Sequence, residues 1–203
     1  MKKDKITYTA AIAIFIISIL IIGYASYEII YSKRKVNKNI EILNNIEKNK
    51  SIRSTNSNNQ NNNESEKDKD IYNKHGIIGK LTIERSKKTL PVVEGTSDEN
   101  LKSGAGHYKG SYLPGESGNC VIFGHRDGVF SNLDEVKIND IITVETDKGK
   151  FIYKVIDTKI TEPKEEEIIK NYNEPMLTLV TCYPFGYVGA APQRFIVIAQ
   201  LQR

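Results

Sequence analysis

The sequence predicts a mainly β domain, either a closed barrel or a sandwich, preceded by an N-terminal helix. Short apolar runs rich in Val, Ile, Thr and aromatic residues recur from residue 76 onward, and Gly, Pro and Asn turns separate them. Residues 6–27 instead form one continuous apolar run of the length that a membrane-spanning helix needs. A chain of 203 residues allows one ordinary domain plus this appendage.

The N-terminus is predicted to be an uncleaved signal anchor, with residues 1–5 ahead of the span and residues 6–30 forming the transmembrane segment. A cleaved signal peptide is the alternative, but its apolar region would be shorter, and Gly23–Tyr27 offers only a poor cleavage site. Lysines precede the span, and lysines with one arginine follow it, so charge does not decide the orientation.

Residues 31–70 are predicted to form a helical stalk followed by an Asn-rich flexible tether. Val36, Ile40, Leu43 and Ile46 recur near helical spacing among polar residues. From Ser51 to Asp70 the chain is polar apart from one Ile and cannot bury enough apolar surface to fold.

The net charge of the chain, +4, comes from its membrane-proximal part. Residues 1–70 hold 12 Lys+Arg and 8 Asp+Glu, against 29 and 25 in the whole chain, which leaves 17 of each in residues 71–203. The predicted β domain is therefore neutral, and nucleic-acid binding has no electrostatic support.

Residues 71–203 contain the runs that predict the β domain. A hairpin is expected over 77–83 and 90–93, around a polar turn at 85–88, with Pro91 at an edge or strand start. A capped helical turn is expected at 97–102 and a short surface helix at 165–170. The remaining predicted strands are 119–123, 141–146, 151–160, 176–182 and 194–201.

Two of these runs flank a loop, residues 183–193, and carry reactive groups at its two ends. Cys182 ends the first run and Arg194 begins the second, so antiparallel pairing would place a thiol beside a guanidinium. His125 lies on a Gly-flanked turn just after the strand at 119–123. A nucleophile, a proton carrier and an oxyanion-stabilising cation are the parts of cysteine-based acyl transfer.

At these residues the chain resembles a sortase. Thr178-Leu179-Val180-Thr181-Cys182 matches the TLxTC nucleophile strand, and a His after Val121–Gly124 and an Arg opening the last strand complete the site. Gly104–Tyr108 looks like a further family segment, and the stretch around Cys182 and Arg194 looks most like the class D enzymes. The resemblance covers about residues 72–203.

The resemblance implies an eight-stranded sortase barrel at residues 71–203, outside a Gram-positive-type cell. It also implies that the N-terminal helix anchors this barrel and that residues 1–5 are cytoplasmic. It implies a cysteine transpeptidase that cleaves an LPxTG-like sorting signal between Thr and Gly and transfers the protein to a peptidoglycan-precursor amine. Cys182 would be the nucleophile, His125 the proton donor and acceptor, and Arg194 the oxyanion stabiliser. No cofactor or metal is implied.

Several residues have more ordinary interpretations. Cys120 lies inside a strand and is expected to be a buried apolar residue, although a disulfide with Cys182 would exclude the proposed chemistry. A zinc site lacks the usual Cys-x-x-Cys or His-pair spacing. His107 is expected to have a structural hydrogen-bonding role. Asp127 and Arg126 are expected to form an exposed turn, which leaves Arg194 as the active-site cation.

Three further alternatives remain open from the sequence. Glu165–Glu167 could hold calcium, but consecutive acids on a short helix point in different directions, which favours a solvated face. A pilin-polymerising sortase would commonly carry an Asp-Pro-aromatic lid, and the chain has no Trp and no Asp-Pro pair. A membrane-tethered β-barrel binding module would contain an inert Cys182.

Overall fold

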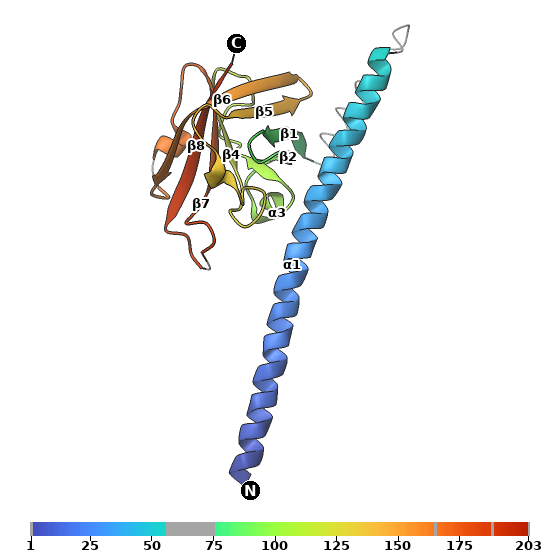
Figure 1. The fold of residues 1–203 in the computed structure, drawn as a ribbon, viewed down its shortest axis with the longest axis vertical. Coiled ribbons are helices and arrows are strands. Elements are labelled where there is room, and N and C mark those ends of the chain that lie inside the picture. Colours follow the sequence, from blue (N-terminus) through green and yellow to red (C-terminus); the bar gives the residue numbers. More distant parts are fainter. Residues whose placement is uncertain (1, 56–75, 165, 188, 203) are drawn as a thin grey trace. The chain divides into compact units, whose positions relative to one another are not determined.

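The computed structural model describes residues 2–55, 76–164, 166–187 and 189–202. The chain divides into two compact units, residues 1–34 and residues 35–203. One continuous helix, α1 (Lys2–Thr55), contains the predicted membrane segment and the predicted stalk (Figure 1). The greater part of the predicted tether lies outside the described residues.

The first unit is helical and apolar on all sides. Its large side chains are exposed, among them Phe15 at 67% and Leu20 at 66%. A helix that is hydrophobic all round needs an apolar environment. Among the described residues, α1 is the one helix long and apolar enough to cross a membrane, with its candidate span starting at Tyr8 near the N-terminus.

The second unit contains a closed barrel, which confirms the predicted fold class. Three short helical segments lie between its strands: α3 (Asp98–Leu101), which Ser97 caps, and the 3₁₀ turns η1 (Leu133–Glu135) and η2 (Glu166–Ile169). The strands are β1 (Ile77–Ile83), β2 (Lys88–Glu94), β3 (Ala105–His107), β4 (Gly118–Phe123), β5 (Ile141–Thr146), β6 (Gly149–Thr161), β7 (Pro175–Tyr183) and β8 (Gln193–Leu201).

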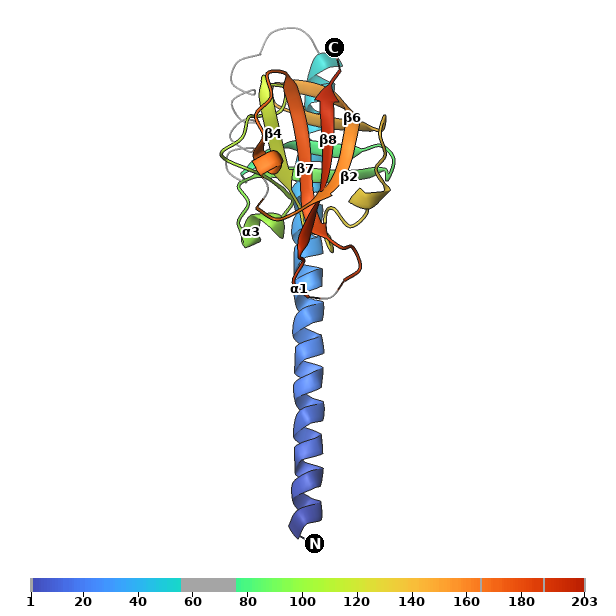
Figure 2. The same cartoon turned by 90° about the vertical axis from the view of Figure 1, so that its left-hand side faces the viewer.

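The strands close in the order β1-β2-β3-β4-β7-β8-β6-β5. Two neighbouring pairs, β2 with β3 and β4 with β7, are parallel, and the others are antiparallel. Figure 2 shows β4, β7, β8 and β6 side by side. Because β4 and β7 are parallel, they end at the same edge of the sheet.

Strands β4, β7 and β8 bury side chains on both faces. Inside the barrel, Leu177, Leu179 and Val197 belong to the main core. On the opposite face, a second cluster contains Val121, Met176, Val180, Ile196 and Ile198, and Ile168 of η2 packs against it. Strands that are covered on both faces read as continuous apolar runs, and this explains why the sequence pattern here is not alternating.

Two local predictions differ from the structure. The short strand β3 was not expected at residues 105–107, where two glycines and a histidine give no strand signal. Pro91 lies inside β2, opposite Lys80, and not at a strand start. Pairing of β2 with β3 begins only at Val92. At Pro91, which cannot donate a main-chain hydrogen bond, the β3 side of β2 is therefore an unpaired edge.

Candidate active site

The predicted pairing of the thiol and the guanidinium is present in the structure. Cys182 of β7 and Arg194 of β8 are direct partners in the antiparallel ladder, so their side chains lie on the same face of the sheet. The alternation along each strand places them on the face of Val180 and Ile196. Because Tyr183 and Gln193 still pair, the connecting loop is 184–192, shorter than predicted.

His125 reaches the same edge through the end of β4. Phe123 pairs with Val180 in the parallel ladder, and the Gly124 N–H donates to the Val180 carbonyl at 3.0 Å. The Thr181 hydroxyl donates to the Gly124 carbonyl at 2.7 Å. His125 directly follows Gly124, and Cys182 directly follows Thr181. The fixed register therefore carries the imidazole and the thiol to one end of the sheet.

The three groups differ in exposure. His125 is exposed, whereas Cys182 and Arg194 are half-buried. Nη1 of Arg194 donates to the carbonyls of Ala191 (3.2 Å) and Gln193 (2.9 Å), where the chain enters β8. Among the described residues, no hydrogen bond joins the thiol, the imidazole and the guanidinium to one another. In an unliganded site such hydrogen bonds are often long and tighten only when substrate binds.

Cys120 is separate from this site. Both cysteines are free thiols, so the disulfide alternative is wrong. Cys120 is 1% exposed and belongs to the main core, as predicted. Its burial raises the pKa of the thiol far above its ordinary value. A thiol that stays protonated in an apolar core is inert, whereas Cys182 is half-buried and remains the candidate nucleophile.

A family model supplies the decisive comparison. The sortase domain model matches residues 81–202, which contain His125, Cys182 and Arg194. The chain belongs to the sortase family. Members of this family are cysteine transpeptidases, and the register described above brings a thiol, an imidazole and a guanidinium to one sheet edge of this sortase.

Named relatives agree with this assignment. The sortase is 42% identical to sortase D of Bacillus subtilis (strain 168) over 120 residues, which cover 59% of this chain and 61% of that protein. It is 26% identical to sortase A of Bacillus anthracis over 207 residues, which cover 99% and 97% of the two chains. The identity to a sortase D agrees with the class D resemblance of the sequence.

Solved structures show the same barrel. Sortase C of Streptococcus pneumoniae is similar with a TM-score of 0.60 and 29% identity, over 66% of this chain and 70% of that one. Sortase C1 of Streptococcus agalactiae, in complex with MTSET, gives a TM-score of 0.59 and 32% identity, over 64% and 69% of the two chains.

The prediction that Arg126 lies on an exposed turn is wrong. Arg126 is 8% exposed, and its guanidinium donates to carbonyls of the β7–β8 loop. No residue type in the sequence indicates this contact, because the acceptors are main-chain oxygens 58 to 63 residues further along the chain. Asp127 is exposed, as expected of a turn residue, with 74% of its side chain accessible.

His107 has the structural role that the sequence suggested. Its Nδ1 lies 3.0 Å from Glu94 Oε2, and its Nε2 lies 2.9 Å from the Tyr112 carbonyl and 3.1 Å from Ser111 Oγ. The Ser111 hydroxyl also donates to the Tyr108 carbonyl and accepts from the Val121 N–H. Since the imidazole is 2% exposed and fully hydrogen-bonded, it holds β3 and the following turn together.

Glu165–Glu167 are the residues that could hold calcium. The side chains of Glu165, Glu166 and Glu167 lie outside the part of the chain that the structure describes. The backbone of Glu166–Ile169 forms the 3₁₀ turn η2, close to the predicted short helix.

Proposed function

We propose that this sortase is a membrane-anchored transpeptidase of a Gram-positive-type cell surface, similar to the class D enzymes. Its substrate would be a secreted protein with an LPxTG-like sorting signal near the C-terminus. The acceptor would be an amine of a peptidoglycan precursor. The observation that carries the proposal is the register of β4, β7 and β8, which supports one shared site for His125, Cys182 and Arg194.

The chemistry assigns one role to each group. The Cys182 sulfur attacks the Thr carbonyl carbon of the signal, so a C–S bond forms while the Thr–Gly C–N bond breaks. His125 gives its proton to the departing Gly nitrogen, and Arg194 donates hydrogen bonds to the oxyanion. The acceptor amine then attacks the thioester and returns a proton to His125. The new C–N bond forms as the C–S bond breaks, and the Cys182 thiolate is regenerated.

A peptide assay on the full chain in detergent micelles tests the proposal. Cys182→Ala should abolish cleavage of an LPxTG-like peptide and abolish the thioacyl-enzyme seen by mass spectrometry, because only the sulfur is removed. Cys120→Ala is the matched control and should keep turnover while lowering the free energy of unfolding by about 1 kcal/mol. Equal loss of cleavage from both folded variants would contradict the assignment of the nucleophile.

Two alternative functions compete with this proposal: a pilin-polymerising sortase and a non-catalytic barrel. A pilin-polymerising activity has support in the similarity to sortase C structures, one of them titled a pilus-related sortase C. The chain has no Trp and no Asp-Pro pair of the kind that those enzymes use in a lid. A non-catalytic barrel would not require the thiol, and the Cys182→Ala assay separates it from an enzyme.

Membrane anchoring is a separate part of the proposal. It is supported by the exposed apolar surface of α1 in residues 8–30 and by the length of that run. The catalytic barrel would lie outside the cell, where sorting signals and wall precursors are found. Protease added to intact protoplasts should then release a barrel fragment that begins between about residues 51 and 72. Recovery of that fragment only after lysis would overturn the orientation.

A further inference from the structure

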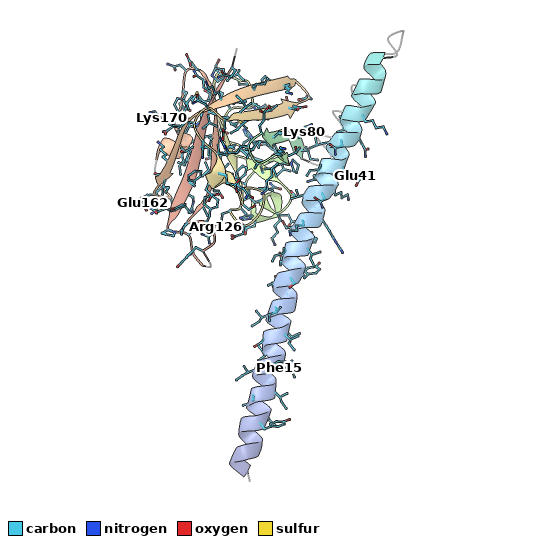
Figure 3. The ribbon with its side chains drawn as sticks, viewed as in Figure 1. Phe15, Glu41, Lys80, Arg126, Glu162 and Lys170 are labelled. Carbon is cyan, nitrogen blue, oxygen red and sulfur yellow. The ribbon has the colours of Figure 1, made fainter. Side chains whose placement is uncertain are left out.

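Arg126 holds the β7–β8 loop, residues 184–192. Its Nη1 donates to the Pro184 carbonyl at 3.0 Å, and its Nη2 donates to the carbonyls of Tyr187 (2.7 Å) and Gly189 (2.9 Å). The Arg126 side chain is only 7% exposed. Figure 3 labels Arg126 at the end of the barrel where β7 runs into this loop.

These three carbonyls are the main partners of a nearly buried charge. Asp127 Oδ2 lies 3.5 Å from Nε, but that carboxylate is mostly exposed to solvent. The Tyr187 ring centroid lies 5.8 Å from the guanidinium carbon, within the range of a cation–π contact. A buried guanidinium is tolerated only when hydrogen bonds replace its water, so the loop carbonyls and Arg126 depend on each other.

The loop has little main-chain support of its own. In its described part, residues 184–187 and 189–192, the loop contains one turn, at Phe185–Gly186, and no helix or strand. Arg126 binds three of its carbonyls, and Arg194 binds the Ala191 carbonyl. The loop is therefore held by these two arginine side chains together with Phe185, whose ring packs against Tyr183 and Phe195.

The position of Arg126 in the chain links this loop to the active site. It follows His125 directly, while the loop that it binds begins just after Cys182-Tyr183 and ends just before Arg194. A single side chain thus connects the imidazole segment to the loop that lies between the thiol and the guanidinium.

We propose that Arg126 is a positioning residue of this sortase, which fixes His125 relative to Cys182 and Arg194 by holding the β7–β8 loop. The inference rests on the proposed transpeptidase function. The planar fork of Arg reaches several acceptors at once, whereas a Lys ammonium at the same place is a compact point charge on a flexible stem. Loss of the fork would displace the reacting groups from one another without removing any of them.

The test compares Arg126→Lys and Arg126→Met with the matched control Arg85→Lys. Arg85 also makes a two-point contact, through Nε and Nη2 to Asp140, but in the hairpin of β1 and β2. Arg126→Lys should lower kcat by about tenfold to a hundredfold, the size expected for small misplacements of reacting groups, and leave KM nearly unchanged. Arg126→Met should lower kcat further, and Arg85→Lys should leave kcat unchanged.

Hydrogen exchange supplies a readout that does not need activity. Peptides that contain the turn at Phe185–Gly186 and the adjoining ends of β7 and β8 should exchange faster in both Arg126 variants, while those from the centres of β7 and β8 should not. A wild-type protein that cleaves no sorting peptide would defeat the proposed function, and the exchange result would still decide whether Arg126 holds the loop. Unchanged exchange would overturn the loop contact. Faster exchange with wild-type kcat, or a rise in KM alone, would overturn the positioning role.

Discussion

Thr161 of β6 pairs with Arg194 of β8 in the antiparallel ladder. The Thr161 hydroxyl has no hydrogen-bond partner among the described residues. The residue is 6% exposed, and its Oγ1 is the one buried side-chain polar atom without a partner among the described residues. Burial of an unsatisfied hydroxyl destabilises a fold by roughly 1–3 kcal/mol. Thr161 thus lowers the stability of the barrel at the position that pairs with Arg194.

Replacement of this hydroxyl by a methyl group should therefore stabilise the protein. Thr161→Val is expected to raise the free energy of unfolding by about 1 kcal/mol, measured by urea unfolding of the full chain in detergent micelles. Thr178→Val is the matched control, because the equally buried Thr178 hydroxyl donates to Asn119 Oδ1 at 2.7 Å. That control should lower the free energy of unfolding. If Thr161→Val destabilises the protein as much, its hydroxyl has a hydrogen-bond partner.

Single residues also show where sequence reasoning succeeds and where it stops. Cys182 and Arg194 could be placed together because each lies at the end of an apolar run and the two runs flank one loop. Arg126 could not be placed, since its acceptors are main-chain carbonyls that no residue type identifies. A buried Arg on a polar turn has the same sequence pattern as an exposed one.

At the scale of elements, the strands that carry the site were the easiest to predict. The main core covers one face of β7 and the second cluster covers the other, so Leu177, Leu179 and Val180 are all apolar and buried. Long apolar runs bounded by Gly and Pro are a strong strand signal. Their ends were predicted within a residue or two, and this precision was enough to place the reactive groups.

The strand β3 shows the opposite case. A Cβ at Gly106 would lie 2.6 Å from the Gly95 carbonyl oxygen, and a Cβ at Gly104 would lie 2.5 Å from the Pro91 carbonyl oxygen. Glycine is therefore required for the close approach of the β3 segment to β2. The same absence of side chains removes the apolar signal from which a strand is predicted, so only the tertiary contacts reveal this element.

At the scale of the whole molecule, the buried thiol makes stability depend on pH. Burial raises the pKa of Cys120, so the folded barrel keeps the thiol proton throughout the alkaline range. The unfolded chain loses that proton above its ordinary thiol pKa of about 8.5. Above this pH the unfolded state binds fewer protons than the folded state, and the free energy of unfolding must fall as the pH rises.

Burial raises the pKa of Tyr153 as well, and its hydroxyl accepts a hydrogen bond from the Gly115 N–H at 2.8 Å. Because an unfolded Tyr titrates only near pH 10, this group adds its own loss of stability at a higher pH than Cys120 does. The two contributions therefore separate along the pH axis. The interval between about pH 8.5 and pH 10 reports on the thiol.

Urea unfolding at a series of pH values should show this dependence. In the wild-type chain, the free energy of unfolding should fall with a limiting slope of about 1.4 kcal/mol per pH unit from Cys120 once the pH exceeds 9. In Cys120→Ala this part of the slope should disappear, although the variant starts less stable at pH 7. The chain contains 11 Tyr and no Trp, so near-ultraviolet circular dichroism of the tyrosines is a suitable signal. A slope that persists unchanged in Cys120→Ala would show that the Cys120 thiol does not contribute to it.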